Sequence, residues 1–298
     1  MPLSVQVQCP AKVNLFLEVT GRRRDGYHNL ATLFAKINLF DVLDVEAAPS
    51  GFELEIADET GQRLAAGPDN LVLVAARAFR KAFRLGMGAR FLLTKRIPVG
   101  AGLGGGSSDA AGTLIALARL YRMELDRSRT AVVRRIAREI GADVPVFLRR
   151  EAVCEGRGIG ERLAPVTPAK ALPWMLLVFP GVSVSTGDVY GRLKGRTRKS
   201  VLTRLTHLDT LKKKLEKGRP VPEWGGLLFN RLEEAVLDYH PEVEQAKTIL
   251  KRLGLAGVLM TGSGAAVYGF VRSRTEGERV LKLVQGYPWK IILTCCLG

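Results

Sequence analysis

The sequence predicts an α+β fold built from two domains, and three observations support this prediction. The chain has 298 residues, more than a single domain usually holds. Its first hundred residues mix alternation of apolar and polar side chains with β-branched and aromatic residues, as strands do. Apolar residues at helical spacing then recur between further strands without a strict strand–helix–strand repeat. We place the boundary in the proline-containing stretch 165–173, between domains 1–165 and 166–298.

Four strands and one helix are expected before residue 98. The helix is expected to begin after Asp69, a residue type that caps helix N-termini, because Leu71, Ala75 and Phe79 follow at helical spacing. The expected strands cover residues 5–9, 13–20, 30–39 and 91–97.

Helices and strands alternate in the rest of the chain. A helix over about 108–120 follows a glycine-rich segment, and another runs from Ser128 to Gly141, a residue type that often ends helices. Beyond the boundary the expected elements are a buried strand at 174–179, helices at 228–239 and 241–253, two strands joined by a glycine turn over 257–271, a helix at 275–285 and a strand at 289–295.

The bulk composition indicates a globular protein in a reducing compartment. Hydrophobic residues make up 47% of the chain, yet no apolar run is long enough to span a bilayer, and the N-terminal residues do not form a secretory signal. The four cysteines form no C-x-x-C pair and are too few for a disulfide scaffold. We therefore expect reduced thiols, a cytoplasmic location, no membrane partner, and a monomer or homodimer.

The formal net charge of +16 is concentrated in one segment. Residues 190–219 hold eleven Lys or Arg against Asp209 and Glu216. Tyr190 is the only aromatic residue there, so the stacking platform of a single-strand nucleic acid site is missing. We interpret 191–219 as a basic, solvated surface that could also attract small anions, and we expect no specific nucleic acid partner. Any non-specific binding should be lost by about 0.2 M salt.

The segment PVGAGLGGGSSDAA, residues 98–111, carries the clearest chemical signal. A predicted strand leads into it and a predicted helix leaves it. Glycines remove side chains so that backbone N–H groups can approach a ligand, and a helix N-terminus adds free amides and a positive dipole end. Ser107 and Ser108 can cap the helix, donate to a phosphate or ligate Mg²⁺. We interpret the segment as a polyphosphate cradle.

Three other readings of this segment are weaker. Gly100-x-Gly102-x-x-Gly105 matches the dinucleotide fingerprint, but the acid expected about twenty residues later lies in a helix end, at Glu124, rather than at a strand end. A Walker loop requires Gly-Lys-Ser/Thr, and no lysine precedes Ser107. A purely structural loop has little reason to hold five glycines, because each costs about 0.5–1 kcal/mol relative to alanine when it is ordered.

Three segments in order resemble the GHMP kinases, a family of small-molecule kinases. They are PAKVNLFLEVTGRRRDGYHNL at 10–30, PVGAGLGGGSS at 98–108 and TGSGAAVYG at 261–269. The first of them, with GADVPVF at 141–147 and FPGVSVST at 179–186, is similar to the members that phosphorylate a cytidine diphosphate-linked methylerythritol in non-mevalonate isoprenoid synthesis. The resemblance runs from about residue 9 to residue 270. Another GHMP kinase, acting on homoserine, mevalonate or a sugar, would share the glycine loop and stays an alternative.

The resemblance implies a two-domain GHMP kinase fold with the active site in the cleft between the domains, and ATP and Mg²⁺ as cofactors. Lys12 and Asp143 would be the catalytic pair. The ATP phosphates would contact Pro98, Val99, Gly100, Ala101, Gly102, Leu103, Gly104, Gly105, Gly106, Ser107 and Ser108. The substrate would contact Asn14, Tyr27, His28, Thr186, Tyr190, Gly262, Ser263 and Gly264. No residue is assigned as the metal ligand, and the basic segment 191–219 matches no motif of the family.

The catalytic pair is less distinctive without the resemblance. Asp143 follows a helix end and precedes Val144-Pro145, where an aspartate more often caps a helix than catalyses. Lys12 lies in an apolar strand pattern, so its side chain is either on an exposed face or held by an anion. In a kinase Asp143 would orient the acceptor hydroxyl and take its proton, and Lys12 would keep Asp143 ionised.

Overall fold

The computed structural model describes residues 4–62 and 64–298. Its contacts divide the chain into two compact units, and each unit is assembled from several segments. The first unit takes residues 1–11, 39–99 and 104–150, and the second takes 12–38, 100–103 and 151–298. The long strands β1 (Ser4–Arg22) and β2 (His28–Ala48) therefore contribute to both units. The division into contiguous domains 1–165 and 166–298 stays a prediction.

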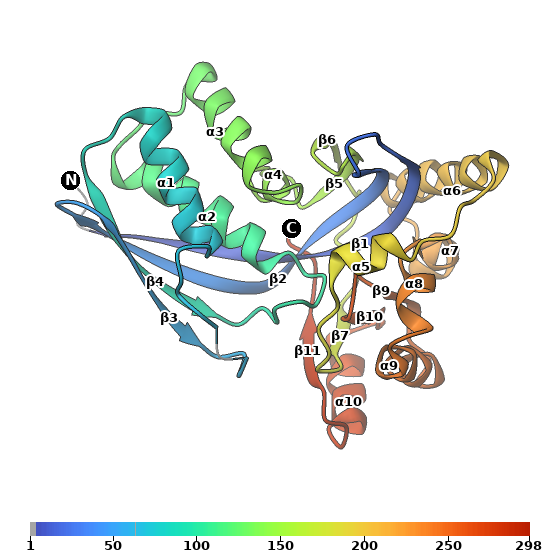
Figure 1. Cartoon of the computed structure of the whole chain (residues 1–298). Coiled ribbons are helices and arrows are strands. Elements are labelled where there is room, and N and C mark those ends of the chain that lie inside the picture. Colours follow the sequence, from blue (N-terminus) through green and yellow to red (C-terminus); the bar gives the residue numbers. More distant parts are fainter. Residues whose placement is uncertain (1–3, 63) are drawn as a thin grey trace. The chain divides into compact units, whose positions relative to one another are not determined.

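Strands and helices alternate along the chain, and Figure 1 labels them in order. The remaining strands are β3 (Phe52–Asp58), β4 (Gly88–Lys95), β5 (Val153–Gly158), β6 (Arg162–Val166), β7 (Met175–Phe179), β8 (Phe229–Asn230), β9 (Ala256–Met260), β10 (Val267–Phe270) and β11 (Lys290–Thr294). The helices are α1 (Leu71–Phe83), α2 (Gly105–Leu120), α3 (Arg127–Ile140), α4 (Val144–Phe147), α5 (Thr186–Gly191), α6 (Arg198–Glu216), α7 (Val221–Trp224), α8 (Glu233–Leu237), α9 (Pro241–Arg252) and α10 (Arg274–Val284).

The first unit packs helices on a sheet. β2 runs antiparallel to β4, which pairs with β3 in parallel. α1 and α2 lie side by side (Figure 1), and both turn small apolar residues inward. A Cβ on Gly112 of α2 would lie 2.3 Å from the sulfur of Cys9 on β1, so α2 rests directly on that strand. This close packing fixes α2, and the glycine-rich segment at its start, against the sheet.

The second unit contains a four-stranded antiparallel sheet in the order β11-β7-β10-β9. α9 packs on β9 and β10, and α10 packs on β7 and β11. In the same unit β5 pairs with β2 and β6, and β8 pairs in parallel with β1 through Phe16↔Phe229. Residues 261–266 of the third motif lie between β9 and β10, and residues 267–269 lie in β10. Across the described ranges, no helix has the length and apolar character needed to cross a bilayer.

The predicted α+β class is confirmed, and several predicted boundaries are wrong. Residues 5–9 and 13–20 form the single strand β1, because the backbone stays extended through Pro10. The cap of α1 is Asn70 rather than Asp69, since the Asn70 side chain accepts a hydrogen bond from the amide of Val72. α2 begins at Gly105, so Ser107 and Ser108 lie inside its first turn and do not cap it.

Two segments differ more strongly from the prediction. Residues 228–239 were expected to form one helix, but they hold the short strand β8 and then α8. The basic segment 191–219 contains the 19-residue helix α6, which buries Leu208, Leu211 and Leu215 along one stripe. Because so many of its other residues are charged, this stripe does not stand out in the sequence.

Candidate active site

Lys12, Asn14 and Thr261 form a buried hydrogen-bonded group in the second unit. The Lys12 ammonium, on a side chain that is 3% exposed, donates to Asn14 Oδ1 at 2.8 Å and to the carbonyl oxygen of Gly102 at 2.9 Å. The backbone N–H of Asn14 donates to Thr261 Oγ1 at 2.9 Å. Residues from all three sequence motifs therefore meet at this point. Lys12 is not on an exposed face, which removes one of the two readings that the sequence left open.

The glycine loop and the third motif also touch through their backbones. Gly102 has φ of 73°, and a Cβ there would lie 2.2 Å from the carbonyl oxygen of Thr261. The amide of Ala266 donates to the carbonyl oxygen of Ala101 at 3.1 Å. Packing alone thus requires glycine at 102. The number of glycines in the loop is therefore weaker support for a bound ligand than the sequence suggested.

Asn230 anchors the start of the third motif through hydrogen bonds of its side chain. Its side-chain amide donates to the carbonyl oxygens of Met260 and Gly262, both at 2.8 Å, and its Oδ1 accepts from the amide of Leu232. Sequence reasoning placed Asn230 inside a helix and missed this role. Its residue type was no signal of this role, because α8 begins only at Glu233, three positions later, and the bonds of Asn230 run to a distant turn.

The predicted substrate residues of the second unit fall into two contacting pairs. The rings of His28 and Tyr190 stack with centroids 5.0 Å apart and planes 22° apart. The hydroxyls of Thr186 and Ser263 are 2.8 Å apart. Tyr27 is 60% exposed. Partial burial, with a smaller contribution from Arg22, lowers the pKa of His28 below its usual value, so its imidazole is neutral at pH 7.

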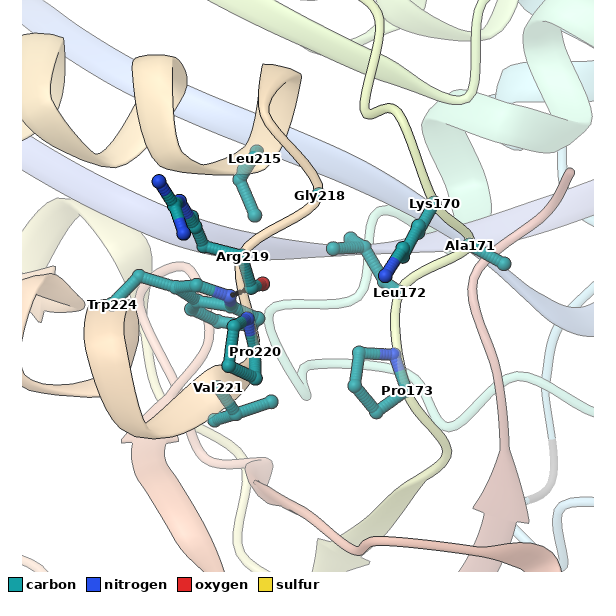
Figure 2. Close-up of a pocket in the computed structure, with 10 residues that line it drawn as sticks. All are labelled: Lys170, Ala171, Leu172, Pro173, Leu215, Gly218, Arg219, Pro220, Val221 and Trp224. Carbon is teal, nitrogen blue, oxygen red and sulfur yellow. Dashed lines mark hydrogen bonds between the residues drawn. The ribbon is translucent and has the colours of Figure 1, made fainter.

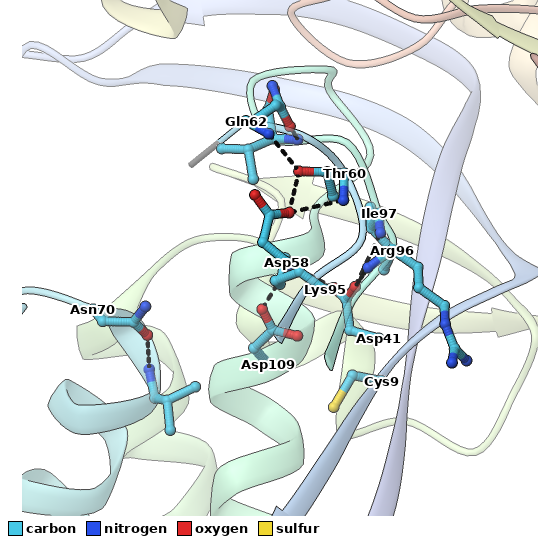
Figure 3. A network of polar contacts seen from close by, with 12 residues as sticks. Cys9, Asp41, Asp58, Thr60, Gln62, Asn70, Lys95, Arg96, Ile97 and Asp109 are labelled. Atoms are coloured by element: carbon cyan, nitrogen blue, oxygen red, sulfur yellow. Dashed lines mark hydrogen bonds and ion pairs between the residues drawn. The ribbon is translucent and has the colours of Figure 1, made fainter. Parts of the chain in front are cut away.

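Lys95 joins the two ends of the glycine loop in the first unit (Figure 3). Its ammonium lies 2.5 Å from Asp41 Oδ2 and 2.8 Å from Asp109 Oδ2, and all three side chains are almost fully buried. Asp41 also accepts hydrogen bonds from the backbone amides of Arg96 and Ile97, where β4 leads into the loop. Asp109 lies in α2, where the loop ends. The network therefore fixes the entry and the exit of the loop.

Within this network, burial is the main influence on the pKa of Asp109. It raises the pKa of Asp109 to about 7, against the opposing effect of Lys95 and with a further increase from Asp41. Glycine at 105 permits the close approach, because a Cβ there would lie 3.1 Å from the Lys95 ammonium. This network could not be predicted from the sequence, since its three residues are far apart along the chain and each is of a type usually found on the surface.

Lys95→Met is expected to lower the free energy of unfolding by about 3–5 kcal/mol at pH 7, because it leaves two buried carboxylates without their cation. Denaturant unfolding at several pH values would measure this. The loss should shrink as the pH falls below about 7, the pKa of Asp109, since that carboxyl can then take up a proton in place of the ion pair. Lys81→Met is the control, because Lys81 is exposed on α1 and its removal should change stability by no more than about 0.5 kcal/mol. A loss for Lys95→Met as small as that of the control would contradict the expectation.

Asp143 lies in the first unit, half-buried, at the N-terminal end of α4. Its side chain makes no capping hydrogen bond to that helix. The helix-cap reading, which the sequence alone favoured, is therefore not what the structure shows. α4 begins without a capping bond from the side chain of Asp143.

A cavity of about 300 Å³ in the second unit contains none of the predicted site residues (Figure 2). Its floor is apolar, with Leu172, Leu215, Val221 and Trp224, while Lys170 and Arg219 lie at its edge. The indole N–H of Trp224 donates to the carbonyl oxygen of Arg219 at 2.8 Å. We therefore do not assign the catalytic chemistry to this cavity.

Comparison with known proteins agrees with the fold and the motifs. Residues 70–151 match the GHMP kinases N terminal domain, and residues 211–286 match the GHMP kinases C terminal domain. The chain is 40% identical over 278 residues to the 4-diphosphocytidyl-2-C-methyl-D-erythritol kinase of Pseudomonas entomophila, covering 92% of this chain and 87% of the relative. It is 39% identical to the kinase of the same name from Thermus thermophilus, covering 93% and 92% of the two chains.

A solved structure gives the same result at the level of the whole chain. The crystal structure of a 4-(cytidine 5'-diphospho)-2C-methyl-D-erythritol kinase superposes with a TM-score of 0.78 at 36% identity, covering 99% of this chain and 100% of that one. Fold and motifs thus define a phosphotransferase of the GHMP class. Within that class the chain belongs to the family of 4-diphosphocytidyl-2-C-methyl-D-erythritol kinases.

Proposed function

We propose that this enzyme transfers the γ-phosphoryl group of ATP to the 2-hydroxyl of 4-diphosphocytidyl-2-C-methyl-D-erythritol, a step of non-mevalonate isoprenoid precursor synthesis. The observation that carries the proposal is the convergence of the three motifs on the Lys12 ammonium, through Asn14, Gly102 and Thr261. The names and high coverage of the relatives support the choice of substrate. We place the enzyme in the cytoplasm, in keeping with its four free cysteines.

The ATP phosphates would lie on the loop 98–108 and the start of α2. The first amides of a helix have no intrahelical partner, and α2, with 16 residues, is long enough for its dipole to favour an anion there. The left-handed glycines 100, 102 and 104 let the backbone of the loop turn its N–H groups toward one point. The anchoring of both loop ends by Lys95 supports a preformed cradle.

The start of α2 also fits a magnesium ion. Ser108 Oγ and Asp109 Oδ1 are buried and have no hydrogen-bond partner among the described residues, and hard oxygen ligands of this kind suit Mg²⁺. A bound Mg²⁺ would neutralise charge on the β- and γ-phosphates.

The remaining roles follow from the chemistry of phosphoryl transfer, which depends mainly on positioning and charge. Asp143 would orient the acceptor hydroxyl and take its proton, a contribution of about 10²–10⁴-fold. Lys12 would stabilise the transferring group, and its bond to Gly102 already ties it to the glycine loop. His28 and Tyr190 would bind the cytosine, while Thr186 and Ser263 would contact the polar part of the substrate.

An ADP-release assay with a panel of alcohols tests the proposal. The panel contains the cytidine diphosphate compound, homoserine, mevalonate and galactose, each with ATP and Mg²⁺. Of the four alcohols, we expect only the cytidine diphosphate compound to give turnover above the background measured with ATP and no alcohol. Comparable turnover with one of the other alcohols would instead make this chain a GHMP kinase of different specificity.

A further inference from the structure

A buried ion pair lies in the second unit, outside the catalytic group. Arg231, directly after β8, is 4% exposed and Glu18 on β1 is fully buried. Arg231 Nε lies 3.9 Å from Glu18 Oε1, and the backbone amide of Arg231 donates to the carbonyl oxygen of Leu17 at 2.8 Å. Burying two charges contributes little net stability compared with packed apolar residues. The pair therefore calls for an explanation other than stability.

The guanidinium of Arg231 also holds the segment that follows α5. Its Nη2 donates to the carbonyl oxygen of Lys194, and its Nη1 contacts Glu234. Glu234 in turn accepts from Arg196 at 2.9 Å, on the same segment. Residues 192–197 lie outside the helices and strands and most are exposed, and the guanidinium of Arg196 also lies over the ring of Phe229, 5.7 Å from its centroid. One side chain thus connects the segment 192–197 to β1.

This attachment bears on the ring of Tyr190. Tyr190 lies in α5, four residues before Lys194, and its ring stacks on His28 at the start of β2. Arg192, next to the end of α5, rests on the ring of Tyr239, which is 60% exposed and so forms only a weak second anchor. α5 is also held by the buried Val189 and by the contact of Thr186 with Ser263, so the contacts at Lys194 secure the C-terminal end of α5, where Tyr190 lies.

We propose that Arg231, held by Glu18, positions Tyr190 for the cytosine of the substrate through its bond to the Lys194 carbonyl. Arg231 is a positioning residue, since it acts through α5 and does not touch the substrate. The inference rests on the proposed function for its kinetic consequence, but not for its structural one. Arginine suits this role because its planar group donates in several directions at once, whereas lysine offers a single compact charge.

The kinetic test uses Arg231→Met in the full chain. Loss of charge-assisted hydrogen bonds to the segment should raise KM for the cytidine diphosphate compound about tenfold. KM for ATP and kcat should stay within about threefold of the parent, because the glycine loop and catalytic residues are unchanged. Arg272→Met is the matched control, since Arg272 is 86% exposed and pairs with Glu276 in the same unit. A fall in kcat at unchanged KM would overturn the proposal, because a merely structural residue would act in that way.

Limited digestion with trypsin tests the attachment without any substrate. The segment offers cleavage sites after Arg192, Lys194 and Arg196, and two more follow at Arg198 and Lys199 in the first turn of α6. Cleavage there should be about tenfold faster in Arg231→Met than in the parent, with Arg231→Lys between them. Unchanged cleavage would overturn the proposal, whereas a parent inactive on the cytidine compound would overturn only the proposed function. Glu18→Gln, which keeps the side-chain shape, should shift both readouts in the same direction and serves if Arg231→Met does not fold.

Discussion

Asp143→Asn is expected to lower kcat by roughly 10²–10⁴-fold, because an amide can orient the acceptor hydroxyl but cannot take its proton. KM for ATP should barely change, since the loop 98–108 is proposed to bind the phosphates. The melting temperature should fall less than it would on loss of a helix cap, because Asp143 makes no capping bond to α4 and asparagine keeps the size of the side chain. Steady-state kinetics and thermal melts on the same preparations would measure all three quantities.

Asp126 provides a matched control on the neighbouring helix. It caps α3 with a hydrogen bond from the amide of Arg129 at 2.8 Å, so Asp126→Ala should cost about 1 kcal/mol of stability and leave kcat normal. Asp143→Asn should show the opposite pattern. If instead it loses stability and keeps normal turnover, Asp143 has no place in the mechanism.

We expect Lys12 to act together with Asp143 in the same chemical step. Lys12→Met keeps the buried stem and should also lower kcat by about 10²–10⁴-fold. The double variant with Asp143→Asn should lose little more than the worse single variant, since residues that act together are not additive. Independent, multiplying losses would mean that the two residues serve different steps.

Replacement of the cytidine in the substrate by uridine is expected to lower kcat/KM by at least about 10²-fold, because a site built on hydrogen bonds leaves a buried group unpaired when the base changes. Neutral His28 offers one donor and one acceptor, and uracil reverses the polarity of the edge that cytosine presents. Competition kinetics with both nucleotides would measure the ratio. If the base stacks on Tyr190 as proposed, it would lie on the ring face turned away from His28, since no space for a base lies between rings 5.0 Å apart.

Two aromatic substitutions separate stacking from hydrogen bonding in this site. His28→Phe keeps a ring against Tyr190 and should reduce the cytidine preference to within about threefold, because only a hydrogen-bonding group can reject the other base strongly. Tyr190→Phe keeps the ring and should retain the preference. A preference that survives His28→Phe would show that another residue reads the base.

The sequence predicted most elements of the fold where periodicity was strong and local. β7, α9 and α10 occur within one residue of their predicted ends, because apolar runs or helical stripes mark them. β8 could not be predicted, since Asn230 is held there by bonds to Met260 and Gly262 from a distant turn. Tertiary contacts there outweighed a local preference for helix.

The candidate site was predicted only as far as motifs reach. Lys12, Asn14 and Gly262 lie in recognisable segments, and the structure places them in one hydrogen-bonded neighbourhood. Asp41, Lys95 and Arg231 lie in no such segment. Their roles depend on which side chains the folded chain buries next to one another, and neither residue type nor spacing reports that.

The interleaving of the two compact units has a consequence for the chain during its synthesis. By residue 150 the ribosome has delivered every segment of the first unit, but residues 12–38 belong to the second unit and still lack most of their partners. Phe16 on β1 pairs with Phe229 on β8, which is synthesised more than two hundred residues later. This edge of β1 stays unpaired until then. Such long-range pairing folds slowly and exposes an unpaired strand edge while it is incomplete. A nascent chain stalled near residue 165 would therefore carry the complete first unit and one strand with an unpaired edge. Such an edge can pair with other chains, so this intermediate should be prone to aggregation.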